Sequence, residues 1–331
     1  MSRIVYWTSF GLVLVAAVLL SGCGGGSSGG SSTPPPRVAF LSDRTGNLDI
    51  YITTMVTGFP TVNLTNHPAA DDAFSWSPTG NQLAFLSDRS GSWELWVINA
   101  NGSGATQLTT DGGGTKADPA WSPVGNKIAY VYNSDIWVYD LTTNTSQNLT
   151  MGNGNNKMPC WSLFGNKIVF ASDRSGNWDI WVMDANGANL TQLTSNPQDE
   201  QRPVWSPNNQ KIAFERGNHV WVMDANGANP VNISSGAGTL NRWPTWSANS
   251  QIVFFEGDGD IYRNDPTGTT LVKITHTGNN YTPNCPKSGS GVAFLSSNSG
   301  NPEIYFMTIW GSSVQNISND PAVDELPIWA P

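Results

Sequence analysis

The stretch Pro159 to Thr194, PCWSLFGNKIVFASDRSGNWDIWVMDANGANLTQLT, decides the fold, because near copies of it recur along most of the chain. The Trp of its first element recurs at spacings of 45, 40, 44 and 41 residues, at Trp76, Trp121, Trp161, Trp205 and Trp246. A repeat of about 40 to 50 residues with alternating apolar positions is typical of the blades of a β-propeller.

Each copy predicts four short strands separated by tight turns. In the quoted copy the strands are PCWS, KIVF, DIWVMD and TQLT, in which β-branched and aromatic residues recur with a period of two. The three turns have the patterns of Pro78 to Asn81, Asp173 to Gly176 and Asn186-Gly187, whose residue types accept hairpin backbone angles. We therefore expect antiparallel four-stranded blades.

The second strand of the repeat can be counted seven times. Its starts are Val38, Leu83, Ile128, Ile168, Ile212, Ile252 and Val292. The first copy lacks its own PxWS strand, whereas Leu326 to Pro331, after the seventh copy, has the sequence of one. We predict an all-β, seven-bladed β-propeller of four-stranded antiparallel blades, whose C-terminal strand pairs into the N-terminal blade and leaves no open edge.

The N-terminus predicts export and anchoring. Arg3 precedes the apolar stretch Val5 to Leu20, as in a signal peptide. Leu20 to Cys23 resembles the bacterial lipobox, in which the chain is cut before a Cys that becomes lipidated. Gly24, rather than Asp, after that Cys implies an outer-membrane location facing the periplasm or the cell surface.

These features divide the chain into three parts. We assign residues 1–22 to a lipoprotein signal peptide, residues 23–36 to the lipidated Cys23 with a Gly/Ser/Pro tether, and residues 37–331 to the propeller. The tether is expected to hold a folded body at a distance from a membrane surface.

The repeat resembles that of TolB and its relatives, a WD40-like β-propeller family that includes the propellers of prolyl-oligopeptidase-type and tricorn proteases. The consensus WSPxGNKIAFxSDRSGNWDIWVMDANG carries the resemblance over nearly all of residues 37–331. It implies a fold and says little about function. TolB has a helical N-terminal domain and a six-bladed ring, so a count of seven argues against a direct role in the Tol system. We also expect no peptidase domain of the kind that the protease relatives have.

Composition excludes some classes of function. The chain has 16 Lys and Arg, which are scattered, against 25 Asp and Glu, for a formal net charge of -9, so we expect no nucleic-acid partner. It has three His, of which His67 and His276 lie in loops between blades, and we expect no metal site. Cys160 and Cys285 belong to non-adjacent blades, so buried thiols are favoured over a disulfide.

Two kinds of residue recur once per blade and are therefore best explained by packing. Trp recurs on the first strand and on the third, and we expect both columns in the core: Trp76, Trp121, Trp161, Trp205, Trp246 and Trp329, then Trp96, Trp137, Trp181 and Trp221. An acidic column begins the third strands, at Asp49, Glu94, Asp135, Asp179, Asp260 and Glu303, with His219 in the fifth blade. We expect each carboxylate to accept backbone N–H bonds within its own hairpin.

The candidate binding site is the set of turns that enter the first strands, because these surround the mouth of a propeller channel. The residues three or four positions before each Trp are Asp72, Asp118, Lys157, Arg202, Arg242 and Glu325, with Trp243 beside them. They are acidic in blades 1 to 3 and basic in blades 4 to 6. Two interpretations stay open: a solvated rim of random sign, or a polarised funnel that orients a zwitterionic or extended peptide. In the second, Ala at Arg202 and Arg242 is expected to weaken binding without changing the melting temperature.

The sequence therefore predicts a monomeric, lipid-anchored envelope protein that binds or scaffolds a protein or peptide. It is predicted to touch the membrane through its anchor only, and to have no catalytic residues and no cofactor. The alternative is a polysaccharide-active propeller enzyme, similar to lyases with a metal in the channel. Such an enzyme needs several inward His residues together with carboxylates.

Overall fold

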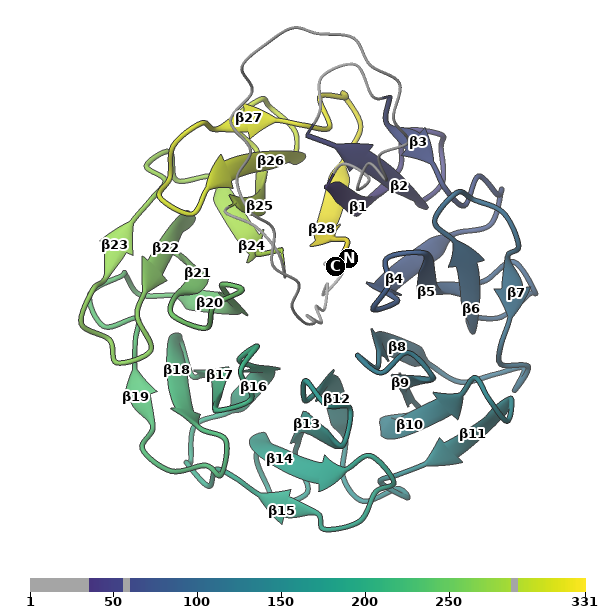
Figure 1. Ribbon diagram of the computed structural model, residues 1–331, viewed down its shortest axis with the longest axis horizontal. Helices are drawn as coiled ribbons and strands as arrows, with labels where there is room; N and C mark the ends of the chain where they lie inside the picture. The colour runs from purple at the N-terminus through teal and green to yellow at the C-terminus, as the bar shows by residue number, and fades with distance from the viewer. Residues whose placement is uncertain (1–35, 56–59, 287–290) are drawn as a thin grey trace, which may run out of the picture.

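The protein is a closed ring of seven four-stranded sheets (Figure 1). The computed structural model describes residues 36–55, 60–286 and 291–331, and the predicted signal peptide and Cys23 lie outside them. All regular elements in the described residues are β-strands, and no helix among them is long and apolar enough to cross a membrane. The predicted seven-bladed propeller is thus confirmed.

In each blade the four strands follow one another from the centre of the ring to its rim, and we call them first to fourth in that order (Figure 1). Blade 1 consists of β28 (Asp324–Trp329), β1 (Arg37–Ser42), β2 (Asp49–Thr54) and β3 (Val62–Asn63). Blade 2 consists of β4 (Asp71–Trp76), β5 (Gln82–Ser87), β6 (Glu94–Asn99) and β7 (Thr106–Gln107). Blade 3 consists of β8 (Lys116–Trp121), β9 (Lys127–Tyr132), β10 (Asp135–Asp140) and β11 (Thr145–Asn148). Blade 4 consists of β12 (Asn156–Trp161), β13 (Lys167–Ser172), β14 (Asp179–Asp184) and β15 (Thr191–Gln192). Blade 5 consists of β16 (Glu200–Trp205), β17 (Lys211–Arg216), β18 (His219–Asp224) and β19 (Val231–Asn232). Blade 6 consists of β20 (Asn241–Trp246), β21 (Val253–Gly257), β22 (Asp260–Asn264) and β23 (Val272–Lys273). Blade 7 consists of β24 (Asn280–Asn284), β25 (Gly291–Ser296), β26 (Glu303–Thr308) and β27 (Gln315–Asn316).

The ring has two faces that differ in their turns. Because all pairings are antiparallel, the first strand starts where the second ends, as Asp71 opposite Ser87 shows in blade 2. We call this end the entry face, since it also carries the connections between blades and the turns from second to third strands. The opposite end is the exit face, with the turns from first to second and from third to fourth strands. The seven first strands form what we call the inner wall.

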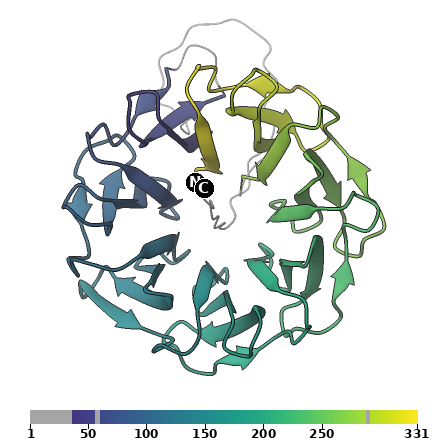
Figure 2. The same cartoon turned by 180° about the vertical axis from the view of Figure 1, so that it is seen from behind.

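The C-terminal strand closes the ring, as predicted. β28 pairs with β1, with Val38 opposite Trp329 and Ser42 opposite Asp324. Figure 2 shows this yellow strand beside the purple start of the described chain. On the entry face, Arg44 Nη2 reaches the Asp324 carboxylate at 2.9 Å, and on the exit face the Ala330 N–H donates to Arg37 O at 2.8 Å.

The first-strand Trp residues are core residues, as expected, and also join the blades. All six are at most 8% exposed. Four indole Nε1 atoms donate to a first-strand carbonyl of the preceding blade: Trp76 to Ile328, Trp161 to Ala120, Trp246 to Val204 and Trp329 to Asn284. Each such bond fixes one blade against the next.

The third-strand Trp residues are half-buried and pack against the core from its edge, so the expectation that they belong to the core is met in part. Arg side chains that follow or end the second strands cover three of the indoles: Arg89 over Trp96, Arg174 over Trp181 and Arg216 over Trp221. These cation–π contacts explain why a Trp column is retained near the surface of the blade. Cys160 and Cys285 are buried thiols rather than a disulfide, as predicted.

The acidic column holds the connections between blades. In blade 2, Thr109 Oγ1 accepts the Leu95 N–H and donates to Glu94, which also accepts the Gly112 N–H at 2.9 Å. Equivalent bonds join Asp135 to Thr150 and Gly152, and Glu303 to Ser318 and Asp320. The expectation of bonds within one hairpin was therefore wrong, because the fourth strand ends beside the start of the third and brings the next connection within reach.

We predict that Trp329→Ala lowers the free energy of unfolding by about 3–5 kcal/mol, because it removes a buried indole and the bond to Asn284 that locks the ring. Urea unfolding monitored by circular dichroism measures this loss. Trp310, which is 64% exposed, is the matched control, and Trp310→Ala should change the same quantity by no more than about 0.5 kcal/mol. Equal effects of the two variants would contradict the role given to Trp329.

Candidate functional site

The predicted channel-mouth residues lie inside the first strands and not in the turns before them. The reason is that each of these strands begins five residues before its Trp, as β4 (Asp71–Trp76) does. The residues fall in two neighbouring columns of the inner wall, the second and the third position of the strand: Asp72, Lys157, Arg242 and Glu325, then Asp118, Arg202 and Trp243. The sequence placed these charged residues in turns at the channel mouth, and the structure places them in the first strands, on the inner wall.

The third column has an unusual backbone. All seven first strands show a register shift near this position, the signature of a β-bulge. The bulged residue has a positive φ in every blade: Ala73 (32°), Asp118 (51°), Met158 (55°), Arg202 (51°), Trp243 (61°), Thr282 (48°) and Leu326 (58°). Small, apolar and charged residues all adopt this conformation. The positive φ is therefore a general feature of the blades and does not mark a ligand site.

Two carboxylates that sequence reasoning missed, the half-buried Glu215 and the buried Glu256, accompany the bulges. Arg202 Nε lies 3.0 Å from Glu215 Oε1, and the same oxygen accepts the Trp243 N–H at 2.7 Å. In the next blade Arg242 binds Glu256 through two nitrogens, at 3.1 and 3.2 Å. The signal was present in the sequence, because the equivalent second-strand positions are apolar elsewhere: Leu41, Leu86, Val131, Ala171 and Leu295.

Asp118 likewise accepts a hydrogen bond from a bulged residue, here between blades 3 and 4. Its Oδ2 accepts the N–H of the bulged Met158 at 2.8 Å, and its Oδ1 has no hydrogen-bond partner among the described residues. Burial raises the pKa of Asp118 to about 6, against the opposing effect of Arg202 and Lys157. Burial likewise raises the pKa of Glu215 and of Glu256.

These contacts change the charge pattern that was predicted for the ring. Glu215 and Glu256 stand beside Arg202 and Arg242, so the half of the ring that the sequence presented as basic is largely neutralised. The polarised funnel is therefore not supported by the placement of charges. Asp72 and Glu325 lie elsewhere, and Glu325 helps to line a separate hollow between blades 1 and 2, with an empty volume of about 740 Å³.

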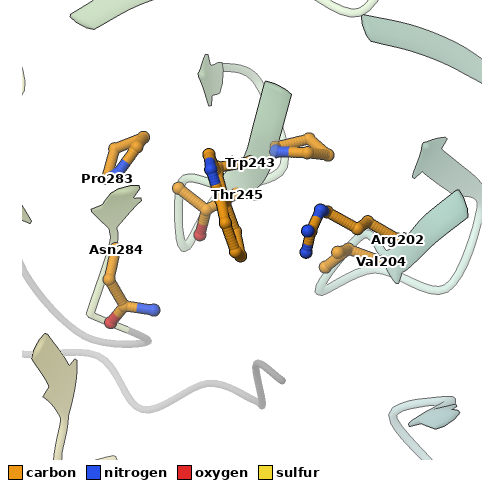
Figure 3. Close-up of a pocket in the computed structure, with 7 residues that line it drawn as sticks. Arg202, Val204, Trp243, Thr245, Pro283 and Asn284 are labelled. Atoms are coloured by element: carbon orange, nitrogen blue, oxygen red, sulfur yellow. The ribbon is translucent and has the colours of Figure 1, made fainter. Parts of the chain in front are cut away.

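An aromatic and a cationic side chain meet on the inner wall of blades 5 and 6. The Arg202 guanidinium carbon lies 3.6 Å from the centre of the Trp243 ring. Figure 3 shows the indole standing between Arg202 on one side and Asn284 and Pro283 on the other. The residues line a small, partly open cavity, completed by Val204, Pro244 and Thr245. We call this the Arg202–Trp243 cavity.

A second cation–aromatic contact lies in the neighbouring blade. Lys157 Nζ is 3.7 Å from the centre of the Trp178 ring and donates to Gln201 Oε1 at 2.8 Å. Burial lowers the pKa of Lys157, and Arg202 adds to this effect. Among the residues that the structure describes, no three His, Cys, Asp or Glu side chains gather as ligands for a metal ion. The arrangement suits binding by stacking and charge.

We predict that Asp118→Asn removes a pH dependence of stability. The folded-state pKa of Asp118 is raised from 3.8 to about 6, so between about pH 4 and 6 the folded chain keeps a proton that the unfolded chain releases. The free energy of unfolding therefore falls by about 3 kcal/mol as the pH rises through that window and is level above it. Urea unfolding at pH 4 and pH 7 should show this fall reduced in the variant, whose amide oxygen still accepts the Met158 N–H.

We predict that Arg202→Ala destabilises the fold, contrary to the sequence-based expectation of an unchanged melting temperature. It leaves the half-buried Glu215 without its cation, which costs about 3 kcal/mol. The pair Arg202→Gln with Glu215→Gln removes both charges and should recover most of this loss in thermal unfolding. A double variant as unstable as Arg202→Ala would show that packing, not charge, sets the effect.

A family model, that of the TolB beta propeller domain, matches residues 30–135 and 113–263, which together are more than half of the chain. The chain belongs to the TolB β-propeller family. A comparison with curated proteins finds no match.

Solved structures resemble the ring at low sequence identity. TolB from Acinetobacter baumannii is 17% identical, with a TM-score of 0.61, over 89% of this chain and 67% of that one. An oligogalacturonate lyase in complex with manganese is 15% identical, with a TM-score of 0.67, over 86% and 85%. A puromycin hydrolase is 14% identical, with a TM-score of 0.67, over 88% and 55%. At these identities the likeness shows the fold alone, and that fold serves a TolB protein and two enzymes.

Proposed function

We propose that this TolB-family propeller is a non-catalytic binding protein of the cell envelope, which takes a protein or peptide partner at the Arg202–Trp243 cavity. The observation that carries the proposal is the indole of Trp243, stacked on Arg202 and facing an open cavity on a rigid wall. Trp and Arg are the residue types most enriched among the hot spots of protein interfaces. A wall fixed by strand pairing on both sides loses little freedom when a partner binds.

The proposed location rests on the N-terminal sequence. Residues 1–22 have the features of an exported signal peptide, and Cys23 follows a sequence that resembles a lipobox. We propose that the mature chain is a monomer, anchored through lipid at Cys23 in the outer membrane, with Gly24 supporting that destination over the inner membrane. The Gly/Ser/Pro tether then lets a rigid ring search for its partner close to the membrane.

The shape and chemistry of the cavity favour an extended peptide. The indole offers an apolar face, Pro244 and Pro283 add apolar walls, and Thr245 and Asn284 add polar atoms. A few polar groups in a mainly apolar hollow are the usual pattern of a specific binding site. The Arg202–Glu215 and Arg242–Glu256 pairs balance the charge beside the cavity in blades 5 and 6, which suits a partner of low net charge.

We predict that Trp243→Ala weakens partner binding at least about tenfold, because it removes the stacking surface of the cavity. The lipidated protein is used to isolate its partner from native envelopes, mass spectrometry identifies that partner, and calorimetry measures its dissociation constant with each variant. Trp93→Ala is the matched control, since Trp93 is also half-buried but lies in the turn from the second to the third strand of blade 2. Unchanged affinity in Trp243→Ala, or an equal loss in Trp93→Ala, would rule out this cavity as the site.

The second candidate, a polysaccharide-active lyase with a metal in the ring, is supported by the fold of the manganese-bound lyase. Metal analysis of the purified protein, followed by assay on acidic oligosaccharides, separates the two proposals. About one equivalent of manganese together with cleavage would favour the enzyme. Binding of an identified protein by a metal-free chain would favour the proposal made above.

A further inference from the structure

The two faces of the ring differ sharply in charge. Of the 25 carboxylates in the sequence, four lie on the exit face, at Asp140, Asp184, Asp224 and Asp265. Three of these four form ion pairs on that face: Lys127–Asp140 at 3.7 Å, Lys167–Asp184 at 2.8 Å and Lys211–Asp224 at 2.9 Å. The other carboxylates belong to the entry half of the ring, so the acidic character of the protein is concentrated there and the exit face is close to neutral.

The exit face also carries most of the exposed apolar side chains. Seven of the large apolar residues that are exposed lie in or directly after its turns, namely Val62, Val124, Phe164, Leu190, Val272, Trp310 and Val314. Three lie on the entry face, at Met151, Leu240 and Val323. In the part of the chain that the structure describes, the two large aromatic residues that are exposed, Phe164 at 68% and Trp310 at 64%, are on the exit face.

The repeat does not require these aromatic residues. The position of Phe164 is occupied by Thr79 in blade 2 and by Asn208 in blade 5. The position of Trp310, before the turn glycine, is Asn101 in blade 2 and Asn186 in blade 4. Phe164 and Trp310 are therefore exposed aromatic residues, both on the exit face, at positions where other blades have polar residues.

The tether leaves the ring from the same face. β1 begins at Arg37, which is opposite Thr54 at the exit end of β2, and Arg37 Nη2 donates to Gly80 O in an exit-face turn. Residues 24–36 separate Cys23 from this point and span at most about 45 Å when extended. A lipid on Cys23 would therefore be joined to the ring at its exit face.

We propose that the exit face lies against the lipid surface, with Phe164 and Trp310 at the level of the headgroups. Aromatic side chains favour that depth, and a near-neutral face with Lys127, Lys167 and Lys211 approaches anionic lipid more easily than an acidic face does. The acidic entry face then points away from the membrane. The proposal rests on the proposed lipid anchor, and it replaces the expectation that the anchor alone touches the membrane.

The native side chains of the two faces provide the test. Lipidated protein is reconstituted on vesicles of phosphatidylethanolamine and phosphatidylglycerol, separated by flotation and exposed to hydroxyl radicals, and mass spectrometry measures oxidation at each residue. We predict that Phe164 and Trp310 are oxidised at least about threefold more slowly than in a lipid-free form starting at Gly24. Met151 on the entry face, which is 80% exposed, should be oxidised at the same rate in both forms.

A double variant tests whether Phe164 and Trp310 keep the exit face on the membrane. Phe164→Thr with Trp310→Asn gives these positions the residues of Thr79 and Asn101, so the fold is expected to be kept. Amine labelling of Lys167, whose side chain is 43% exposed, should be slower on vesicles in the unaltered protein and return to the lipid-free rate in the variant.

Each outcome bears on the proposal in a distinct way. Protein that does not float with vesicles contradicts the lipid anchor, and this orientation with it. Protein that floats but shows equal oxidation of Trp310 with and without lipid, or protection of Met151 instead, overturns the orientation while leaving the anchor and the partner site intact. Protection of Phe164 and Trp310 by an added protein, but not by vesicles, would assign the face to a protein partner.

Discussion

The pairing of β28 with β1 is the constraint on which the rest of the structure depends. A ring of blades has no stable edge until its last strand is in place, because each inner strand is packed and hydrogen-bonded against the blade before it. Two hydrogen bonds of the first-strand Trp residues show this dependence. Trp329 donates to Asn284 in blade 7, and Trp76 donates to Ile328 in β28 itself. One strand therefore supports both of its neighbours, and the inner wall is continuous only because that strand is present.

The buried charges of the inner wall follow from a backbone need. In blades 4 and 6 the bulged residue of the first strand turns its backbone N–H toward the preceding blade, and a buried N–H requires an acceptor. Asp118 and Glu215 supply it for Met158 and Trp243, and Arg202 then offsets the charge of Glu215. The cation that stacks on Trp243 is thus held in place by a structural ion pair. A surface suited to recognition has been built from groups that the ring already requires.

The sequence predicted the fold well because the repeat encodes it locally. The Trp spacing, the turn residues and the displaced strand at Leu326 to Pro331 led to seven blades and the correct closure. The candidate site was predicted less well. Period-two patterning places a residue on a face but does not reveal a bulge, so residues of two columns were taken as one. The partners of Asp118 and Trp243 are contributed by neighbouring blades, 40 and 28 residues away, and no local pattern reports such a contact. Glu215 and Glu256 were visible as charges in an apolar column, which is the signal to look for in other repeats.

Ring closure also determines the order in which the molecule can be completed. Arg44 and Asp324 meet across the closing pair although they are 280 residues apart in the chain. For a chain delivered from its N-terminus, β1 is among the first strands to emerge and must wait for nearly the whole polypeptide before its inner neighbour arrives. Contacts of such long range slow folding, and they leave an interrupted chain with an open blade. Proteases and chaperones that meet the chain can therefore distinguish a finished molecule from a truncated one by that single unfilled position.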